Sequence, residues 1–311
     1  MSRLATAAVA IACGAGGACF YLASELGTPG AVILVYLTQL PLFVAGLWLG
    51  AGAAALAGAV GSLVLLAASD VMAAALFAGM NAVPVAVLVR QALLARRRAD
   101  GSVAWYPAGH LAAWLTAFAL AGMAAALLLF GGPHGLQAAL RTLVEEVLDR
   151  IVVRPSPERG DIAAGLALVI PGIIAASWMV MAVANGALAQ GVLARFGASW
   201  RPSPDIAGLG LPRWLPAVLA GAAAATIFAG APRFIGVNVL IALTVPFCLA
   251  GLAVLHAAVR RLPNPPLALV FFYAMAAMFG WPFIAAAVLG LLEPWLGLRR
   301  RLAPHGVVID G

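Results

Sequence analysis

The sequence predicts an all-α fold, a polytopic transmembrane helical bundle of about 8–10 spans, on three observations. Hydrophobic residues occupy 64% of the 311 positions, charged residues only 9%, and the mean hydropathy is +1.06. A soluble domain carries about 25% charged residues, so this chain lacks the polar side chains that would cover a water-exposed surface. The apolar residues also fall in long runs. We therefore expect residues 1–311 to form a single integral membrane domain in the lipid bilayer, and we exclude soluble enzymes.

Each apolar run was compared with the roughly 20 residues that a helix needs to cross a bilayer. Turn-forming residues, such as the GTPG sequence at 27–30 and Asp70, separate the runs. The candidate spans are residues 4–24, 31–49, 51–69, 71–93, 109–131, 162–195, 213–230, 236–259 and 266–298.

The last run, 266–298, is too long for one ordinary span and short for two. A helix over it would be about 50 Å long at 1.5 Å per residue. Gly280-Trp281-Pro282 lies near its middle, where proline breaks or kinks a helix. We favour two short or broken segments, 266–279 and 283–298; the alternative is one long kinked helix with an interfacial end.

Residues 134–154 predict an amphipathic helix at the membrane surface rather than a span. Its apolar residues recur at the helical spacing, and its other face offers the i, i+4 pairs Arg141/Glu145 and Glu146/Arg150. Acidic residues outnumber arginines from 134 to 161, whereas a helix that binds anionic lipid is basic. We expect it to pack on the bundle or on a partner; the alternative is a mobile lid over an outward-facing site.

The basic residues predict the orientation in the membrane. All 18 are arginine, and they lie at the ends of apolar runs, where the positive-inside rule places them. The loops 94–108 and 196–212 and the pair Arg260-Arg261 are therefore expected in the cytoplasm, together with the N-terminus and the Arg-led tail 299–311. This placement accounts for the net charge of +7, so we expect no nucleic-acid partner.

Polar residues within the spans are the candidate binding residues, because polar groups are costly inside a membrane and by default mark function. They are amides with aromatic neighbours rather than chains of charges, which suits hydrogen bonding to a small neutral or zwitterionic molecule. The alternative is that each amide bonds to a neighbouring helix. The candidate substrate-binding residues are Gln39, Asn81, Trp178, Asn185 and Asn238.

Catalytic, metal and cofactor chemistry is not predicted. The sequence has no HExxH, GxSxG or DxxxD motif and no CxxC motif or Cys/His cluster. It also has no lysine, which excludes a Walker A motif of its own. We expect neither an enzyme nor a bound cofactor or metal. Near the C-terminus, Glu293 lies close enough to Arg299–Arg301 for an ion pair that fixes the tail.

The C-terminal string VLGLLEPWLGLRRRL, residues 288–302, resembles the closing signature of the YybS-like family of uncharacterised bacterial membrane proteins. In that family a Gly-Leu-acid segment ends in an Arg-rich tail. Other features are similar to the family: Pro41 at the start of a span, Pro171-Gly172 within one, Leu211-Pro212 before the next, and GLAVL at 251–255. The resemblance implies a multi-pass protein of the bacterial inner membrane.

That family is similar in turn to the S components of energy-coupling-factor vitamin transporters. The resemblance implies a transporter-like protein that binds a small hydrophilic solute from outside and docks on a membrane coupling subunit driven by ATPases. Two small-residue ladders, Ala8-Ala12-Gly16 and Gly50-Ala54-Gly58, would provide such a docking face or pack internally. The alternative function is a non-transporting scaffold or assembly factor that binds a protein partner.

Overall fold

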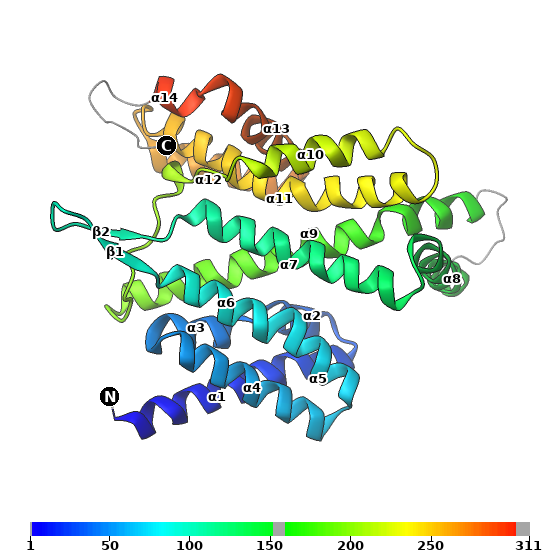
Figure 1. The fold of residues 1–311 in the computed structure, drawn as a ribbon, viewed down its shortest axis with the longest axis horizontal. Coiled ribbons are helices and arrows are strands. Elements are labelled where there is room, and N and C mark those ends of the chain that lie inside the picture. The colour runs from blue at the N-terminus through cyan, green and yellow to red at the C-terminus, as the bar shows by residue number, and fades with distance from the viewer. Residues whose placement is uncertain (1, 152–158, 303–311) are drawn as a thin grey trace. The chain divides into compact units, whose positions relative to one another are not determined.

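A computed structural model describes residues 2–151 and 159–302 and confirms the predicted all-α polytopic bundle (Figure 1). Within these residues, seven helices are long and apolar enough to cross a membrane, or up to eight if a bent pair near the C-terminus counts as one span. The seven are Arg3–Leu26, Pro29–Leu49, Ala51–Ala68, Val71–Ala92, Ala108–Leu129, Arg159–Arg195 and Ala231–Val259.

Several of these spans contain more than one helical element. The elements in chain order are α1 Arg3–Leu22, η1 Ala23–Leu26, α2 Pro29–Tyr36, α3 Leu40–Leu49, α4 Ala51–Ala68, α5 Val71–Phe77, η2 Ala78–Ala82, α6 Val83–Ala92, β1 Ala95–Arg97, β2 Val103–Trp105, α7 Ala108–Leu129, α8 Pro133–Ile151, α9 Arg159–Arg195, η3 Ile206–Gly208, α10 Trp214–Ala225, α11 Ala231–Val259, α12 Pro265–Phe279, α13 Trp281–Leu296 and α14 Leu298–Leu302.

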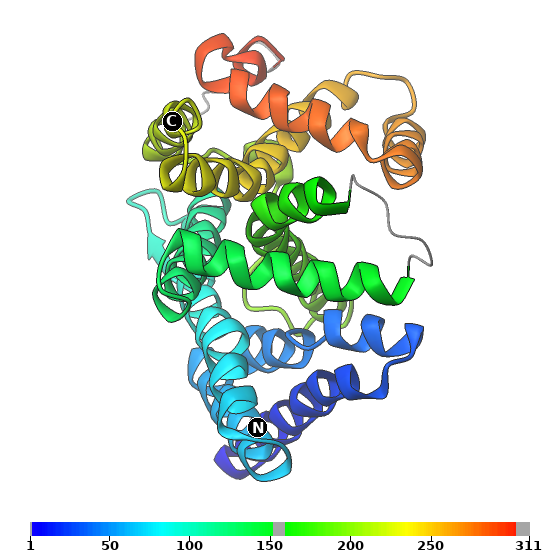
Figure 2. The ribbon, with the colours of Figure 1, turned by 90° about the vertical axis from the view of Figure 1, so that its right-hand side faces the viewer.

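Two predicted spans differ from simple membrane-crossing helices. The expected span 213–230 is only α10, which ends at Ala225; a helix of this length is about 18 Å long and too short to cross a bilayer. The run 266–298 is broken, as we favoured, because Gly280 adopts a φ of +70° and Pro282 starts a new helix. Helices α12 and α13 meet there at 115°, and Figure 2 shows this corner in orange.

The chain forms two compact units. The first contains Met1–Leu115 and Val180–Pro204, and the second contains Thr116–Met179 and Asp205–Gly311. The boundary between the units therefore falls within α7 and within α9, so each of these helices has one end in each unit.

The first unit is built around α4, whose small residues let neighbouring helices approach closely. A Cβ at Gly58 would lie 2.6 Å from the Ala82 Cβ, and one at Gly14 on α1 would lie 2.3 Å from the Ala57 carbonyl oxygen. Ala54 is fully buried. Ala54 and Gly58 of the predicted ladder thus pack internally, whereas nothing lies within 4 Å of a Cβ built on Gly50, the residue before α4.

The other predicted ladder, Ala8-Ala12-Gly16, does not pack internally within the described residues, and its alternative role as a docking face stays a prediction. Ala8 and Ala12 are exposed, and nothing lies within 4 Å of a Cβ built on Gly16. Helix α1 instead packs through the neighbouring stripe of Ala10, Gly14, Gly17 and Ala18. Small residues occur on both faces of α1, so composition alone did not distinguish the packed face.

The second unit is built around α11 in the same way. A Cβ at Gly251 would lie 1.7 Å from the Ala286 carbonyl oxygen of α13, and a Cβ at Gly290 would lie 1.9 Å from the Phe247 carbonyl oxygen. Helix α10 approaches α11 closely at Gly236. Backbone-to-backbone contact of this kind requires glycine on the helix face.

The amphipathic helix is observed as α8, and predicted residues 152–154 lie outside the described residues. The expected ion pair between Arg141 and Glu145 forms at 2.8 Å. Among the described residues, Arg150 makes no ion pair with Glu146; instead Asp149 pairs with Arg159 at the start of α9. The first pair lies within α8, and the second links the end of α8 to the start of α9.

Ion pairs hold the connections near the C-terminus. The expected pair between Glu293 and Arg299 forms at 2.9 Å, and the same guanidinium donates to the Leu209 carbonyl at 2.7 Å. Asp205 precedes Leu209 in the segment between α9 and α10, and its carboxylate pairs with Arg260 at 2.5 Å. Hydrogen bonding to Arg260 lowers the pKa of the Asp205 carboxyl below its usual value. Of the predicted tail 299–311, residues 303–311 lie outside the described part.

The close α11–α13 contact gives a first prediction. Gly251→Ala places a methyl group against the Ala286 backbone, so the helices must separate, and we expect a loss of about 2 kcal/mol or more in unfolding free energy. The matched control is Gly221→Ala on α10, where a Cβ meets nothing within 4 Å. Thermal unfolding in mild detergent measures both. Equal melting temperatures for the two variants would contradict this packing.

Candidate functional site

The span Pro29–Leu49 is interrupted at Leu37–Gln39, between α2 and α3. Pro41 lies in the first turn of α3, where its missing N–H is tolerated. The Leu40 N–H donates to the Leu37 carbonyl at 2.9 Å instead of continuing the α-helical ladder to Tyr36. The Tyr36 carbonyl accepts a side-chain hydrogen bond from Asn185 on α9, at 2.6 Å. A break in one helix is thus closed by an amide from another.

A second irregularity lies opposite, where the span Val71–Ala92 contains the π-helical turn η2. Such turns are frequent at functional sites. Pro84 follows it and has no N–H for the Met80 carbonyl four residues earlier. Gln39 Nε2 donates to that carbonyl at 3.1 Å. The helix break and the π-helical turn are therefore linked directly through a predicted site residue.

Three side-chain oxygens around this break have no hydrogen-bond partner although they are fully buried. They are Thr38 Oγ1, Gln39 Oε1 and Asn185 Oδ1. The amide orientations are determined by their other contacts: Asn185 Nδ2 faces the Tyr36 and Met181 carbonyls, and Gln39 Nε2 faces the Met80 carbonyl. A carbonyl can only accept, so the amide oxygens cannot be exchanged with these nitrogens. The site therefore presents unused acceptors.

Asn81 lies on the π-helical turn itself and is also buried. Its side chain makes no hydrogen bond with any residue in the described part of the chain. Three of the five predicted binding residues, Gln39, Asn81 and Asn185, thus belong to the first unit. Asn185 bonds to the backbone of the interrupted span at Tyr36, and Gln39 bonds from that span to the backbone of the π-helical turn at Met80.

Asn238 has a different role. Its Oδ1 accepts from the Gly172 N–H at 2.6 Å, while its Nδ2 donates to the Leu168 and Phe234 carbonyls at 2.9 and 2.7 Å. The amide thus inserts into the hydrogen-bond ladder of α9 beside Pro171. All its donors and the acceptor are used, so this residue fits the alternative of helix packing. Trp178, also in the second unit, is a buried residue of α9.

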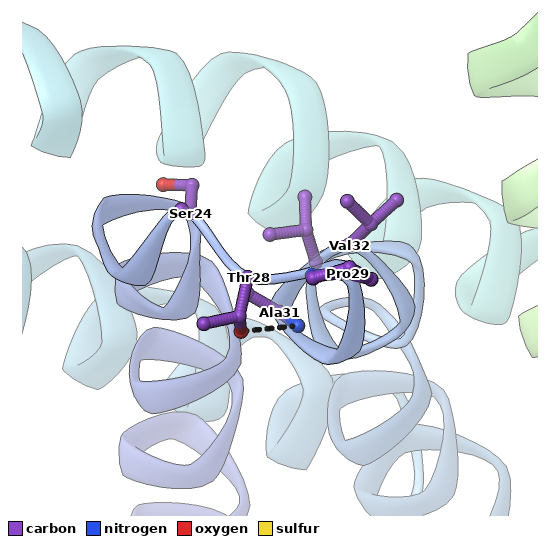
Figure 3. A pocket seen from close by; sticks show the side chains of 7 residues that line it. Ser24, Thr28, Pro29, Ala31 and Val32 are labelled. Atoms are coloured by element: carbon purple, nitrogen blue, oxygen red, sulfur yellow. Dashed lines mark hydrogen bonds between the residues drawn. The ribbon is translucent and has the colours of Figure 1, made fainter.

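An open pocket of about 400 Å³ lies on the first unit at the start of α2. Figure 3 shows the Thr28 hydroxyl capping this helix through the Ala31 N–H, with Val32 beside it. Val35 also lines the pocket, and its carbonyl accepts from the Thr38 N–H at 3.2 Å. The pocket lining thus includes a residue one helical turn before Thr38, although none of the predicted site residues lines the pocket.

Sequence reasoning found the amides and the interruption of a span by Pro84, but it missed Thr38 and the break at Leu37–Gln39. Thr38 was overlooked because a hydroxyl in an apolar run commonly bonds to its own helix. The signal that was available was the proline spacing: Pro41 and Pro84 each mark a place where the helical ladder loses a donor.

Comparison with known proteins supports the membrane assignment. Residues 158–293 match the family described as "Predicted membrane protein (DUF2232)". The match covers less than half of the chain and includes all of α9–α12 and most of α13. No curated protein and no solved structure matches the chain. Together with the apolar helices, the match supports an integral membrane protein of an uncharacterised family.

The contrast between Asn238 and Asn81 gives a second prediction. Asn238→Leu leaves the Leu168 carbonyl and the Gly172 N–H without their side-chain partner, and we expect a cost of about 2 kcal/mol in unfolding free energy. Asn81→Leu removes no described hydrogen bond and should change stability by less than about 0.5 kcal/mol. Unfolding in a detergent titration measures both. A larger loss for Asn81→Leu would overturn the assignment of Asn238 to packing.

Proposed function

We propose that the protein is transporter-like and binds a small hydrophilic solute in the first unit, at the break between α2 and α3. The proposal is supported by one observation above all: Thr38, Gln39 and Asn185 hold buried oxygens without partners. Buried polar atoms are normally satisfied, and each unsatisfied one costs about 1–3 kcal/mol. A solute that donates hydrogen bonds to these oxygens would recover that cost.

The chemistry of the site defines the class of solute. The two amide oxygens only accept, and the Thr38 hydroxyl accepts as well as donates, so the ligand should present N–H or O–H groups or a positive charge. Among the described residues, no group of three or more His, Cys, Asp or Glu side chains is placed to hold a metal ion. A small polyol, amide or amine fits a site built from neutral oxygens.

Interrupted helices support the same proposal. Broken helices that expose backbone and side-chain polar groups frame the binding sites of many transporters. The pocket at the start of α2 offers an approach to the site, and the predicted orientation would put this end of the helix on the outer face. Solute capture from outside is also what the resemblance to S components implies, and a membrane coupling subunit with ATPases would then be its partner.

A scaffold or assembly factor is the second candidate. It is favoured by Asn238, whose amide has no free group: it bonds to Gly172 and Leu168 of α9 and to the Phe234 carbonyl of its own helix α11. A scaffold requires no ligand at the α2–α3 break, so the two functions differ in what Thr38 does.

The deciding experiment is native mass spectrometry of the full chain purified in mild detergent, recording any retained non-lipid molecule. Thr38→Val removes a hydroxyl that has no partner and keeps the side-chain volume. We therefore expect unchanged thermal stability but loss of the retained molecule by tenfold or more, about 1.4 kcal/mol. Asn185→Leu should lose it as well.

The matched control is Thr244→Val on α11, because that hydroxyl bonds to the Ile241 carbonyl of its own helix at 2.6 Å. This variant should keep the molecule. A retained molecule that persists in both Thr38→Val and Asn185→Leu would overturn the site. A ligand-free mass with a stoichiometric protein partner would favour the scaffold.

A further inference from the structure

Arg201 is a buried cation in the first unit, in the loop that follows α9. Only 7% of the residue is exposed. Its guanidinium Nη1 donates to the carbonyl of Ala92, the last residue of α6, at 3.0 Å. Gln190 on α9 donates to the Arg201 carbonyl and to the Ser199 hydroxyl, each at 2.7 Å. These hydrogen bonds hold the loop against α6 and α9 and fix the position of the guanidinium.

This guanidinium makes no ion pair with a carboxylate in the described part of the chain, and Ala92 is its one hydrogen-bond partner there. Arginine has five N–H donors, so most of its donors are unused. The helix C-terminus offers about half a negative charge, which compensates the cation only in part. Burial accordingly lowers the pKa of Arg201. By contrast, the buried Glu293 carboxylate is matched by Arg299.

The surroundings are basic rather than acidic. Helix α6 leads from Ala92 directly into β1, which carries exposed Arg96 and Arg97 and pairs with β2 in a hairpin. Asp100 is the acidic residue in this hairpin, and it caps the Ser102 N–H within the turn. A positive field without a matching acid attracts an anion.

Exposed aromatic residues lie next to Arg201 in the chain. Trp200 precedes it and is 63% exposed, and Phe196 at the end of α9 is 78% exposed. Tryptophan is enriched at the level of the lipid headgroups. The loop lies just beyond the span Arg159–Arg195, where a headgroup would meet it.

From these contacts we propose that Arg201 binds the phosphate group of an anionic phospholipid, with the arginines of the β1–β2 hairpin adding long-range attraction. The planar guanidinium donates in pairs to phosphate oxygens. Basic pockets beside transmembrane helices bind lipid phosphates in this way. A lipid is favoured over free phosphate because exposed aromatic residues adjoin Arg201 in the chain and because acyl chains would lie along the apolar end of α9.

The test uses the full chain in mild detergent and two lipids with identical acyl chains, phosphatidylglycerol and phosphatidylcholine, with binding measured by native mass spectrometry. We expect phosphatidylglycerol to bind at least about tenfold more tightly. Arg201→Gln should abolish this preference. The matched control is Arg195→Gln, which replaces an exposed arginine at the end of α9. It should change the preference for phosphatidylglycerol by less than about twofold.

An unchanged preference in Arg201→Gln would overturn the proposal. Inorganic phosphate that binds in an Arg201-dependent manner, without a preference between the lipids, would overturn the lipid as its source. If Arg201→Gln does not fold, hydrogen exchange of the wild-type loop 196–204 decides. Slower exchange with phosphatidylglycerol than with phosphatidylcholine supports the site, and equal exchange overturns it.

Discussion

Backbone groups in apolar helices need hydrogen-bond partners, because the interior of a membrane offers no water to satisfy them. This constraint explains the positions of the buried amides. Pro84 removes the donor that Met80 would receive in a regular helix, and Gln39 supplies one. Next to Pro171, the amide of Asn238 spans the gap between two ladder groups of α9. Proline creates the irregularity, and an amide from another helix stabilises it.

Some of the amides that bond to these backbone carbonyls do not use all of their own polar atoms. An amide has both donors and an acceptor, and at the α2–α3 break only the donors of Gln39 and Asn185 are used. In the second unit both ends of the Asn238 amide are used. The amides at the α2–α3 break therefore keep oxygens that can accept further hydrogen bonds, whereas the amide of Asn238 keeps none. Small residues on α4 hold the site at this break together by close packing.

Arginines near the helix ends also differ in whether their hydrogen-bonding groups have partners. Arg299 and Arg260 have carboxylate partners that fix the connections around α13 and α11. Arg201 is buried against a helix C-terminus and has no such partner among the described residues. The protein thus uses one residue type both in ion pairs that fix loops and as a buried cation against a helix C-terminus.

The amino-acid sequence by itself determined the all-α membrane fold, most spans, the amphipathic helix and the Glu293–Arg299 pair, because hydropathy, period and local charge spacing are properties of neighbouring residues. It also named the amides of the site. Only the tertiary structure decided which face of α1 packs, that Asn238 is consumed in packing, and that Thr38 has no partner. These depend on which helix lies opposite, and a chain rich in alanine and glycine offers many equivalent faces. Whether a polar side chain has a hydrogen-bond partner depends on a second residue from another helix, so the sequence of one helix does not predict it.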